Sequence, residues 1–390
     1  PWIDDLNQPC QLTSAIRAMQ HGSGPSTPRS ASEAMVAAFD YRAPSDIRFG
    51  RGKAQSAVAD IAALGQRVLL CTGANAARSA WLVEDLRSHG CAVLRLTCAV
   101  EPSLDTLLAA LPEARAHAPD VVVGLGGGAA VDFGKAMAEL VPATGDPMDH
   151  LEVVGRGLPL VEAPLPFVAI PTTAGTGSEV TKNAVIGVPE AARKVSLRDV
   201  RMIAHMAIVD PALTDNTPRD ITLASGLDAV TQVIEPYLCT RANALTDALC
   251  VSAIPKGLRA LHQLMQSESS DARDALAWTS LSGGLALSNA GLGAVHGLAG
   301  VIGGRTGAAH GAICGVLLPH ALAVNLSALP KDAVVRQRFE WVADQIARTL
   351  GCSSENAFAS LASWSMDCGL PSLSALGVRA EDMDAIAEDA

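Results

Sequence analysis

The stretch V-V-V-G-L-G-G-G-A-A-V-D-F-G-K-A, residues 121–136, decides the fold. Its apolar first half is typical of a buried β-strand, and a helical pattern begins directly after the glycines. Glycines let a backbone approach a phosphate closely, and a helix that begins there offers free N–H groups. The stretch therefore predicts a phosphate-binding turn at Gly126, Gly127 and Gly128. Because it is neither G-x-G-x-x-G nor a P-loop, a tight strand-to-helix turn without a ligand is the alternative interpretation.

Short apolar runs alternate with helical segments from residue 43 to residue 210. Strands are expected at residues 68–71, 92–96, 121–125, 167–170 and 207–209, with helices from residue 77, over 104–116 and after the glycine turn. This alternation implies right-handed β-α-β crossovers and a parallel, covered sheet. Beyond residue 211, long Ala/Leu-rich segments follow, in which no strand is expected.

The chain of 390 residues is long enough for two domains, and we expect it to divide into three parts. Residues 1–42 form an N-terminal extension whose Ser/Pro-rich piece at 22–32 is expected to be loose. Residues 43–210 form an α/β dinucleotide-binding domain, and residues 211–390 form an all-α domain for metal and substrate. Because the first residue is Pro1 and not Met, we expect that the true start is missing or processed.

Charge and cysteine usage argue against several classes of protein. The formal net charge is -11 and Lys/Arg runs are few, so we expect no nucleic-acid partner. The nine cysteines form no C-x-x-C pair, which predicts reduced, mostly buried thiols in place of a zinc knuckle or a disulfide framework. We find no charge-free apolar run of about 18 residues and no signal pattern. We therefore expect no membrane partner and a cytoplasmic location.

A second motif, I-P-T-T-A-G-T-G-S-E-V-T, follows the strand expected at 167–170. It places four hydroxyls, those of Thr172, Thr173, Thr176 and Ser178, on a glycine-containing loop. Such loops donate hydrogen bonds to ribose, amide or phosphate oxygens, and open α/β sheets bind ligands at the carboxyl ends of their strands. A hydroxyl-rich surface turn would explain the same composition.

The third motif, G-L-D-A-V-T-Q-V-I-E-P-Y at residues 226–237, places Asp228 and Gln232 one turn apart on a mostly apolar helix. Further along, His296 lies in a helix of small residues and His310 follows a glycine-rich break. A histidine in an apolar helix is usually a core residue. Two such histidines with an aspartate, in a half poor in polar groups, point instead to a shared divalent ion such as Fe²⁺ or Zn²⁺.

At these residues the chain resembles the iron-containing (group III) alcohol dehydrogenase family, which is related in fold to glycerol dehydrogenase and dehydroquinate synthase. The motifs G-G-G-A-A-V-D-F-G-K, P-T-T-A-G-T-G-S-E-V-T, A-I-V-D-P-A-L-T, G-L-D-A-V-T-Q-V-I-E, G-L-G-A-V-H-G and A-H-G-A stand in order between about residues 44 and 325. Each is weak alone, whereas their order and spacing together are specific.

The resemblance implies a dehydroquinate synthase-like fold: an α/β domain with a parallel nucleotide-binding sheet, an all-α C-terminal domain and a cleft between them. It further implies NAD or NADP, a divalent metal (Fe or Zn), a small alcohol/aldehyde or hydroxy/oxo-acid substrate, and a homodimer. The residues that it assigns fall into three sets. The cofactor would contact Gly73, Gly126, Gly127, Gly128, Ala129, Thr172, Thr173, Thr176, Ser178 and Lys194; the metal would bind Asp228, Gln232, His296 and His310; Asp132 and His310 would be catalytic.

The chain departs from the family pattern at three positions. Gln232 stands where the family usually has a histidine, and an amide is a weaker donor to Fe²⁺ or Zn²⁺ than imidazole. Gly300 replaces a second histidine that would relay protons, so water or a ribose hydroxyl is expected to do so. Gly73 replaces an aspartate that would oppose the 2′-phosphate of NADP. Relatives also usually continue beyond residue 390, so we expect that a final helix is missing.

The leading hypothesis is a metal-assisted, NAD(P)-dependent alcohol dehydrogenase or aldehyde reductase that acts by hydride transfer. One alternative is a metal-independent reductase on the same scaffold, with His296 and His310 as acids or hydrogen-bond donors. The other is a catalytically silent protein that keeps the cleft to bind a nucleotide.

Overall fold

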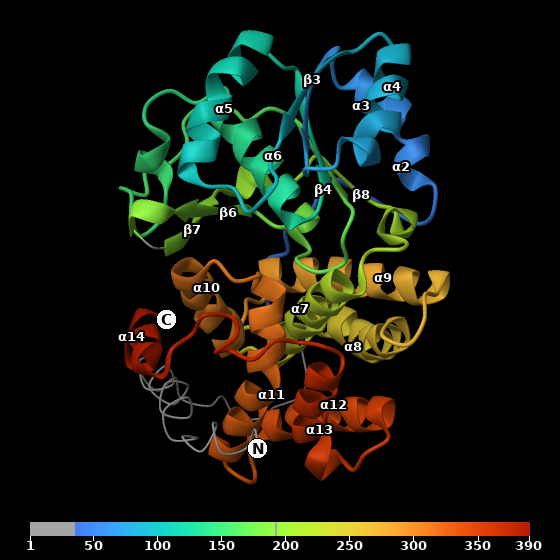
Figure 1. Ribbon diagram of the computed structural model, residues 1–390, viewed down its shortest axis with the longest axis vertical. Coiled ribbons are helices and arrows are strands. Elements are labelled where there is room, and N and C mark those ends of the chain that lie inside the picture. The colour runs from blue at the N-terminus through green and yellow to red at the C-terminus, as the bar shows by residue number, and fades with distance from the viewer. Residues whose placement is uncertain (1–35, 192) are drawn as a thin grey trace.

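The computed structural model describes residues 36–191 and 193–390, arranged as an α/β half above a helical half (Figure 1). The expected α/β and all-helical architecture is confirmed. The loose piece predicted at residues 22–32 lies outside the described residues. The glycine turn and the hydroxyl-rich loop both lie where the two halves meet.

The main sheet has six parallel strands in the order β1-β8-β5-β4-β2-β3. The strands are β1 (Asp46–Phe49), β2 (Arg67–Thr72), β3 (Ala92–Thr97), β4 (Val121–Gly126), β5 (Phe167–Pro171) and β8 (Met206–Val209). The five strands predicted in this region are all present. The sequence prediction missed the edge strand β1, because its charged, partly exposed residues form no apolar run.

Two strands outside the main sheet were also missed. β6 (Asn183–Val188) and β7 (Arg193–Arg198) pair antiparallel as a separate two-stranded sheet. β7 alternates polar or charged residues with apolar ones. β6 does carry an apolar run, residues 184–188, but Gly187 interrupts it and Pro189 follows directly. This hairpin contacts the helical half (Figure 1).

Helices cover both faces of the sheet because the sheet residues alternate between two cores. Leu69, Cys71 and Val122 face one core, whereas Val68 and Leu70 face the other. The first core lies under α5 (Leu104–His117) and α6 (Gly128–Leu140). The second lies under α2 (Lys53–Ser56), α3 (Val58–Ala63) and α4 (Ala80–Ser88). Because all six strands are parallel, their carboxyl ends lie together at one edge of this covered sheet.

The helical half packs around the long buried helix α7 (Arg219–Leu238), which contacts its neighbours α8, α9, α11 and α12. The remaining helices are α8 (Ala244–Leu264), α9 (Ser270–Asn289), α10 (Ala294–Thr306), α11 (His310–Ala328), α12 (Val334–Leu350), α13 (Ala357–Asp367) and α14 (Met383–Asp389). As predicted, no strand occurs among the described residues after 211. A polar side chain on the inner face of α7 is therefore held inside a helical core.

One helix contradicts the expectation that no membrane-length apolar segment exists. α11 has 19 residues without Asp, Glu, Lys or Arg and is long and apolar enough to cross a membrane. The bent pair α9 and α10, which meet at 98°, passes the same test. Half of the apolar window of α11 is buried inside the protein, as in the core helix of a soluble domain, so length and composition are weak evidence here.

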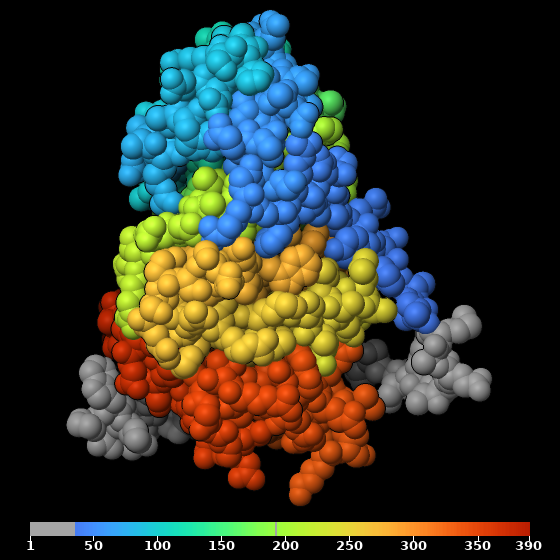
Figure 2. All heavy atoms as spheres, turned by 90° about the vertical axis from the view of Figure 1, so that its right-hand side faces the viewer, coloured from blue at the N-terminus to red at the C-terminus, as the bar shows by residue number. Residues whose placement is uncertain are grey.

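The two halves are joined by close backbone contact and by ion pairs. Gly177 has φ of 58°, and a Cβ built on it would lie 2.6 Å from the Cα of Gly284 on α9. Figure 2 shows the blue N-terminal segments resting on the gold helices. Arg51 pairs with Asp215 at 2.8 Å and with Asp274 at 2.7 Å. The hydroxyl-rich loop is thus fixed against the helical half.

We predict that Gly177→Ala destabilises the protein by more than about 1–2 kcal/mol, the cost of left-handed backbone for a residue with a Cβ, because the new methyl group also meets α9. Gly300→Ala is the control, since it lies within α10 with nothing within 4 Å of its added Cβ. It should leave stability unchanged or raise it by up to about 1 kcal/mol. Chemical denaturation measures both, and equal stability of the two variants would contradict the tight junction.

Candidate active site

The glycine turn and the hydroxyl-rich loop lie side by side at the carboxyl ends of β4 and β5. The Thr172 amide donates to the Gly126 carbonyl at 2.8 Å. A Cβ on Gly127 would lie 3.4 Å from Thr173 Oγ1, and one on Gly128 would lie 2.8 Å from Thr176 Cγ2. The turn is therefore a cradle that side chains would fill, and it opens α6 with free N–H groups.

Two further positions predicted to contact the cofactor flank this cradle. A Cβ on Gly126 would come within 3.4 Å of the Gly73 backbone nitrogen, so the end of β2 adjoins the turn. Ala129 lies in the first turn of α6. Gly73 itself has no atom within 4 Å of a Cβ built on it, which leaves open space at the position where an aspartate would oppose NADP.

Asp132 and Ser178 instead belong to a buried polar network around Lys135. The Lys135 ammonium donates to the Ser178 carbonyl at 2.7 Å and to Thr181 Oγ1 at 2.9 Å. Asp132 accepts hydrogen bonds from Ser178 Oγ and, at 3.0 Å, from the Val185 amide. These contacts fasten α6 to the loop and to β6, so the observed role of Asp132 and Ser178 is positional. Their cofactor and catalytic roles stay predictions.

Burial has opposite effects on the two charged groups of this network. It raises the pKa of Asp132, against the opposing influence of Lys135 and Ser178. It also lowers the pKa of Lys135 to about 8. Each shift follows from the cost of keeping a charge out of water.

In the helical half, four side chains from three helices converge. They are Asp228 on α7, His296 on α10, and His310 and Cys314 on α11, and their donor atoms all lie within 4.8 Å of one another. His296 Nε2 is 3.6 Å and His310 Nε2 is 3.8 Å from Asp228 Oδ1. The structure thus brings together three of the four residues predicted to bind metal.

Two glycines on α11 allow this convergence. A Cβ on Gly311 would lie 2.3 Å from the Ala224 carbonyl oxygen, and one on Gly315 would lie 2.5 Å from Leu227 Cδ1. Both glycines therefore let α11 approach α7 closely. His310 and Cys314 precede them by one residue each, so the same packing carries their side chains to Asp228.

Glu235 fixes the orientation of His296. Its Oε2 accepts a hydrogen bond from His296 Nδ1 at 2.6 Å, and its Oε1 accepts one from the Val295 amide at 2.8 Å. A Cβ on Gly293 would lie only 2.6 Å from Oε1, so a glycine is needed there. With Nδ1 held by this carboxylate, Nε2 is the nitrogen that faces Asp228.

Two atoms of the cluster are buried without a hydrogen-bond partner among the described residues, namely Asp228 Oδ1 and His296 Nε2. Their separation of 3.6 Å is too long for a hydrogen bond. Burial lowers the pKa of His296, but the contacts with Asp228 and Glu235 outweigh it and raise that pKa to about 9. Burial would raise the pKa of Asp228, yet the two histidines bring it below its usual value. The cluster thus attracts positive charge.

Gln232 connects the cluster to the glycine turn. It lies one turn after Asp228 on α7, and its amide nitrogen donates to the Thr176 carbonyl at 2.6 Å. Thr176 in turn packs on Gly128. A continuous set of contacts therefore runs from the cradle to the cluster. The role of Gln232 as a metal ligand stays a prediction.

Comparison with known proteins decides the family. The family model described as "Iron-containing alcohol dehydrogenase" matches residues 44–211, and "Fe-containing alcohol dehydrogenase family, C-terminal" matches residues 222–390. The NAD-dependent methanol dehydrogenase of Bacillus methanolicus is 34% identical over 281 residues, which are 70% of each chain. The chain belongs to the iron-containing alcohol dehydrogenase family.

Two further relatives support the assignment of this chain to the family. Long-chain-alcohol dehydrogenase 1 of Geobacillus thermodenitrificans is 40% identical over 239 residues, which are 61% of this chain and 60% of that protein. The crystal structure of a 1,3-propanediol oxidoreductase superposes with a TM-score of 0.80 at 32% identity, covering 91% of this chain and 94% of that one. The fold is therefore that of solved family members.

In the present chain, the cluster of Asp228, His296, His310 and Cys314 fits a divalent ion. An unpartnered carboxylate oxygen and an unpartnered imidazole nitrogen face one point, and carboxylate, imidazole and thiol are donors that suit borderline transition metals. Cys314 was missed from the sequence because its thiol was compared only with other cysteines. The spacing H-x-x-x-C, which places both side chains on one helix face, was the available signal.

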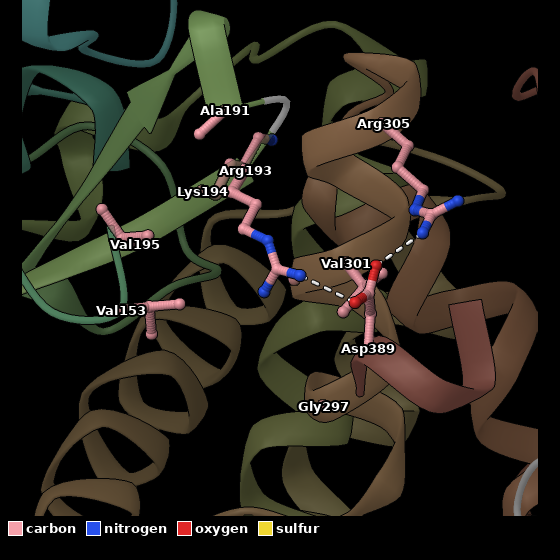
Figure 3. Close-up of a pocket in the computed structure, with 10 residues that line it drawn as sticks. Val153, Ala191, Arg193, Lys194, Val195, Gly297, Val301, Arg305 and Asp389 are labelled. Carbon is pink, nitrogen blue, oxygen red and sulfur yellow. Dashed lines mark hydrogen bonds and ion pairs between the residues drawn. The ribbon is translucent and has the colours of Figure 1, made fainter. Parts of the chain in front are cut away.

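A cavity of about 430 Å³ lies between the hairpin β6–β7 and α10, the helix that carries His296. Arg193 and Arg305 both reach Asp389 there, at 2.7 and 2.5 Å (Figure 3). Gly300, with no side chain, lines the cavity in place of the family histidine. Lys194 lines it as well and pairs with Glu101, so its expected contact with the cofactor stays a prediction.

We predict that Glu235→Gln weakens Zn²⁺ binding by about 10- to 100-fold, as is typical for the loss of a carboxylate that orients a ligating histidine. The amide would no longer fix Nδ1 as a donor to a charged oxygen. Glu139→Gln is the matched control, because Glu139 is equally buried but lies in α6. Competition titration with a chromogenic chelator measures both dissociation constants, and equal values for the two variants would contradict the role of Glu235.

Proposed function

We propose that this chain is an NAD(P)-dependent, metal-assisted dehydrogenase that interconverts a small alcohol or hydroxy acid with the corresponding aldehyde or ketone. The observation that carries the proposal is the pair of unpartnered buried atoms, Asp228 Oδ1 and His296 Nε2, aimed at one point with His310. The dehydrogenase activities of the named relatives, one of them NAD-dependent, support it.

The glycine cradle would hold the nucleotide. The amides that begin α6 after Gly127 are free to donate to pyrophosphate oxygens, and the positive end of the helix dipole favours that charge. Thr173 and Thr176 line the same cradle and offer hydroxyls to the ribose or amide groups. NAD(P) would supply hydride transfer at its nicotinamide.

The helical half would hold the reacting oxygen of the substrate. A divalent ion bound by Asp228, His296 and His310 would supply Lewis-acid polarisation of that oxygen. Glu235 keeps the His296 ring oriented for this task. Gln232, through its bond to the Thr176 carbonyl, holds the cluster and the cradle in register, which reactions between two bound groups require.

The space beside α10 would admit the substrate. Gly297 and Gly300, which follow His296 on α10, line this cavity and leave that part of the helix surface without side chains. With no histidine at residue 300, we expect proton transfer through water or a ribose hydroxyl.

We predict that Asp228→Asn lowers kcat/KM by at least about 100-fold, equivalent to roughly 2.7 kcal/mol of transition-state stabilisation. The amide removes the anionic ligand while Gly126, Gly127 and Gly128 still bind NADH. Asp332→Asn, at an exposed loop position, is the control and should be fully active. Steady-state assays with a panel of alcohols and aldehydes, alongside NADH fluorescence titration, provide both readouts. Full activity of chelator-treated protein would favour a metal-independent reductase instead.

We also predict that Gly73→Asp lowers kcat/KM for NADPH at least about tenfold relative to NADH, because like-charge contacts cost several kcal/mol. The open space at residue 73 accommodates the carboxylate without a clash. Gly73→Asn, which adds the same volume without charge, is the matched control. Equal cofactor ratios in the two variants would show that residue 73 does not face the adenosine ribose.

A further inference from the structure

Cys314 occupies a place in the cluster that no family motif assigns to a cysteine. It lies one turn after His310 on α11, and its Sγ is 3.5 Å from His310 Nε2. The side chain is fully buried. Two other buried atoms of the cluster, Asp228 Oδ1 and His296 Nε2, have no hydrogen-bond partner among the residues described and face the same point. A thiol at this position therefore points at a site that already requires a cation.

The separations of the donor atoms fit one tetrahedral ion. Bonds of about 2.0–2.3 Å from a zinc-like ion to N, O and S ligands imply separations of roughly 3.3–3.8 Å between ligand atoms. The three separations along the path His296–Asp228–His310–Cys314 are 3.6, 3.8 and 3.5 Å. These three separations match that range, and all four donor atoms lie within 4.8 Å of one another.

The usual fourth ligand position is not filled by an equivalent donor. Gln232 uses its amide nitrogen to bond the Thr176 carbonyl at 2.6 Å, which leaves only its amide oxygen as a donor to the ion. A thiolate binds borderline and soft divalent ions more strongly than an amide oxygen does. Cys314 therefore compensates for the loss of an imidazole at residue 232.

We propose that Cys314 is a thiolate ligand that completes an Asp-His-His-Cys site and shifts its preference from Fe²⁺ toward Zn²⁺. The inference rests on the metal-assisted function proposed above. Binding of the divalent ion releases the thiol proton to solvent, so that one S–H bond is lost for each metal–sulfur bond formed. Together with Asp228, the thiolate supplies two negatively charged donor atoms to the ion.

The test uses Co²⁺, which replaces Zn²⁺ and reports thiolate ligation through a sulfur-to-metal charge-transfer band. The wild-type protein, stripped with chelator and loaded with one equivalent of Co²⁺, should show that band together with the weaker d–d bands. Cys314→Ser should lose the charge-transfer band and keep the d–d bands. It should also bind Zn²⁺ at least about tenfold more weakly, because removing even a residue that only orients a ligand lowers metal affinity by that much. Cys250→Ser, which removes an equally buried thiol on α8, should match the wild type.

Two results would overturn the inference and remain distinguishable from each other. If Co²⁺ binds to the wild type with d–d bands but no charge-transfer band, no thiolate ligates the ion. If the band survives in Cys314→Ser, a thiolate other than that of Cys314 does so. In both cases the inference fails and the proposed function stands. If no Co²⁺ binds, the metal-assisted function fails as well. Should Cys314→Ser not fold, the wild type alone decides: X-ray absorption at the zinc edge should show one sulfur at about 2.3 Å from the bound ion, and a first shell of nitrogen and oxygen only would contradict the proposal.

Discussion

The buried carboxylate of Asp228 is the constraint on which the arrangement of the helical half depends. A charge removed from water is costly unless paired, and one oxygen of this group has no hydrogen-bond partner within the described ranges. Helices α7, α10 and α11 surround it with two imidazoles and a thiol, while Glu235 adds a second negative charge behind His296. A divalent ion at its centre would stabilise such a cluster and would supply Lewis-acid polarisation of a substrate oxygen.

Close packing at glycines connects this site to the nucleotide half. Gly311 and Gly315 bring α11 onto α7, and Gly177 brings the hydroxyl-rich loop onto α9. Gln232 then bonds that loop from the helix that carries Asp228. At Gly177 and Gly311 backbone meets backbone, which is a stiffer constraint on the distance between cradle and cluster than contact between flexible side chains. Hydride transfer benefits from such fixed separation.

The sequence revealed those features whose signals are local. The buried strands, the glycine turn at residues 126–128 and the alternation of elements gave the parallel sheet, and the order of motifs gave Asp228, His296 and His310. Strands β1 and β7 were missed because charged residues interrupt their short apolar segments, whereas the apolar run of β6 at residues 184–188 was a signal that the sequence prediction did not use. Cys314 was missed because the cysteines were compared only with one another, although the spacing H-x-x-x-C places Cys314 one turn after His310 on the same helix face. The positions of Asp132 and Ser178 depend on Lys135, a buried lysine whose partners lie more than forty residues away along the chain.

The central claim is that a divalent ion sits among Asp228, His296, His310 and Cys314 while the cradle binds the nucleotide. A crystal structure of the active protein with NAD(H), with diffraction data recorded on both sides of the zinc and iron absorption edges, tests it most directly. The account predicts one anomalous peak within bonding distance of these four side chains and pyrophosphate density at the start of α6. Crystals of active protein with nucleotide bound and no anomalous peak in the cluster would contradict it.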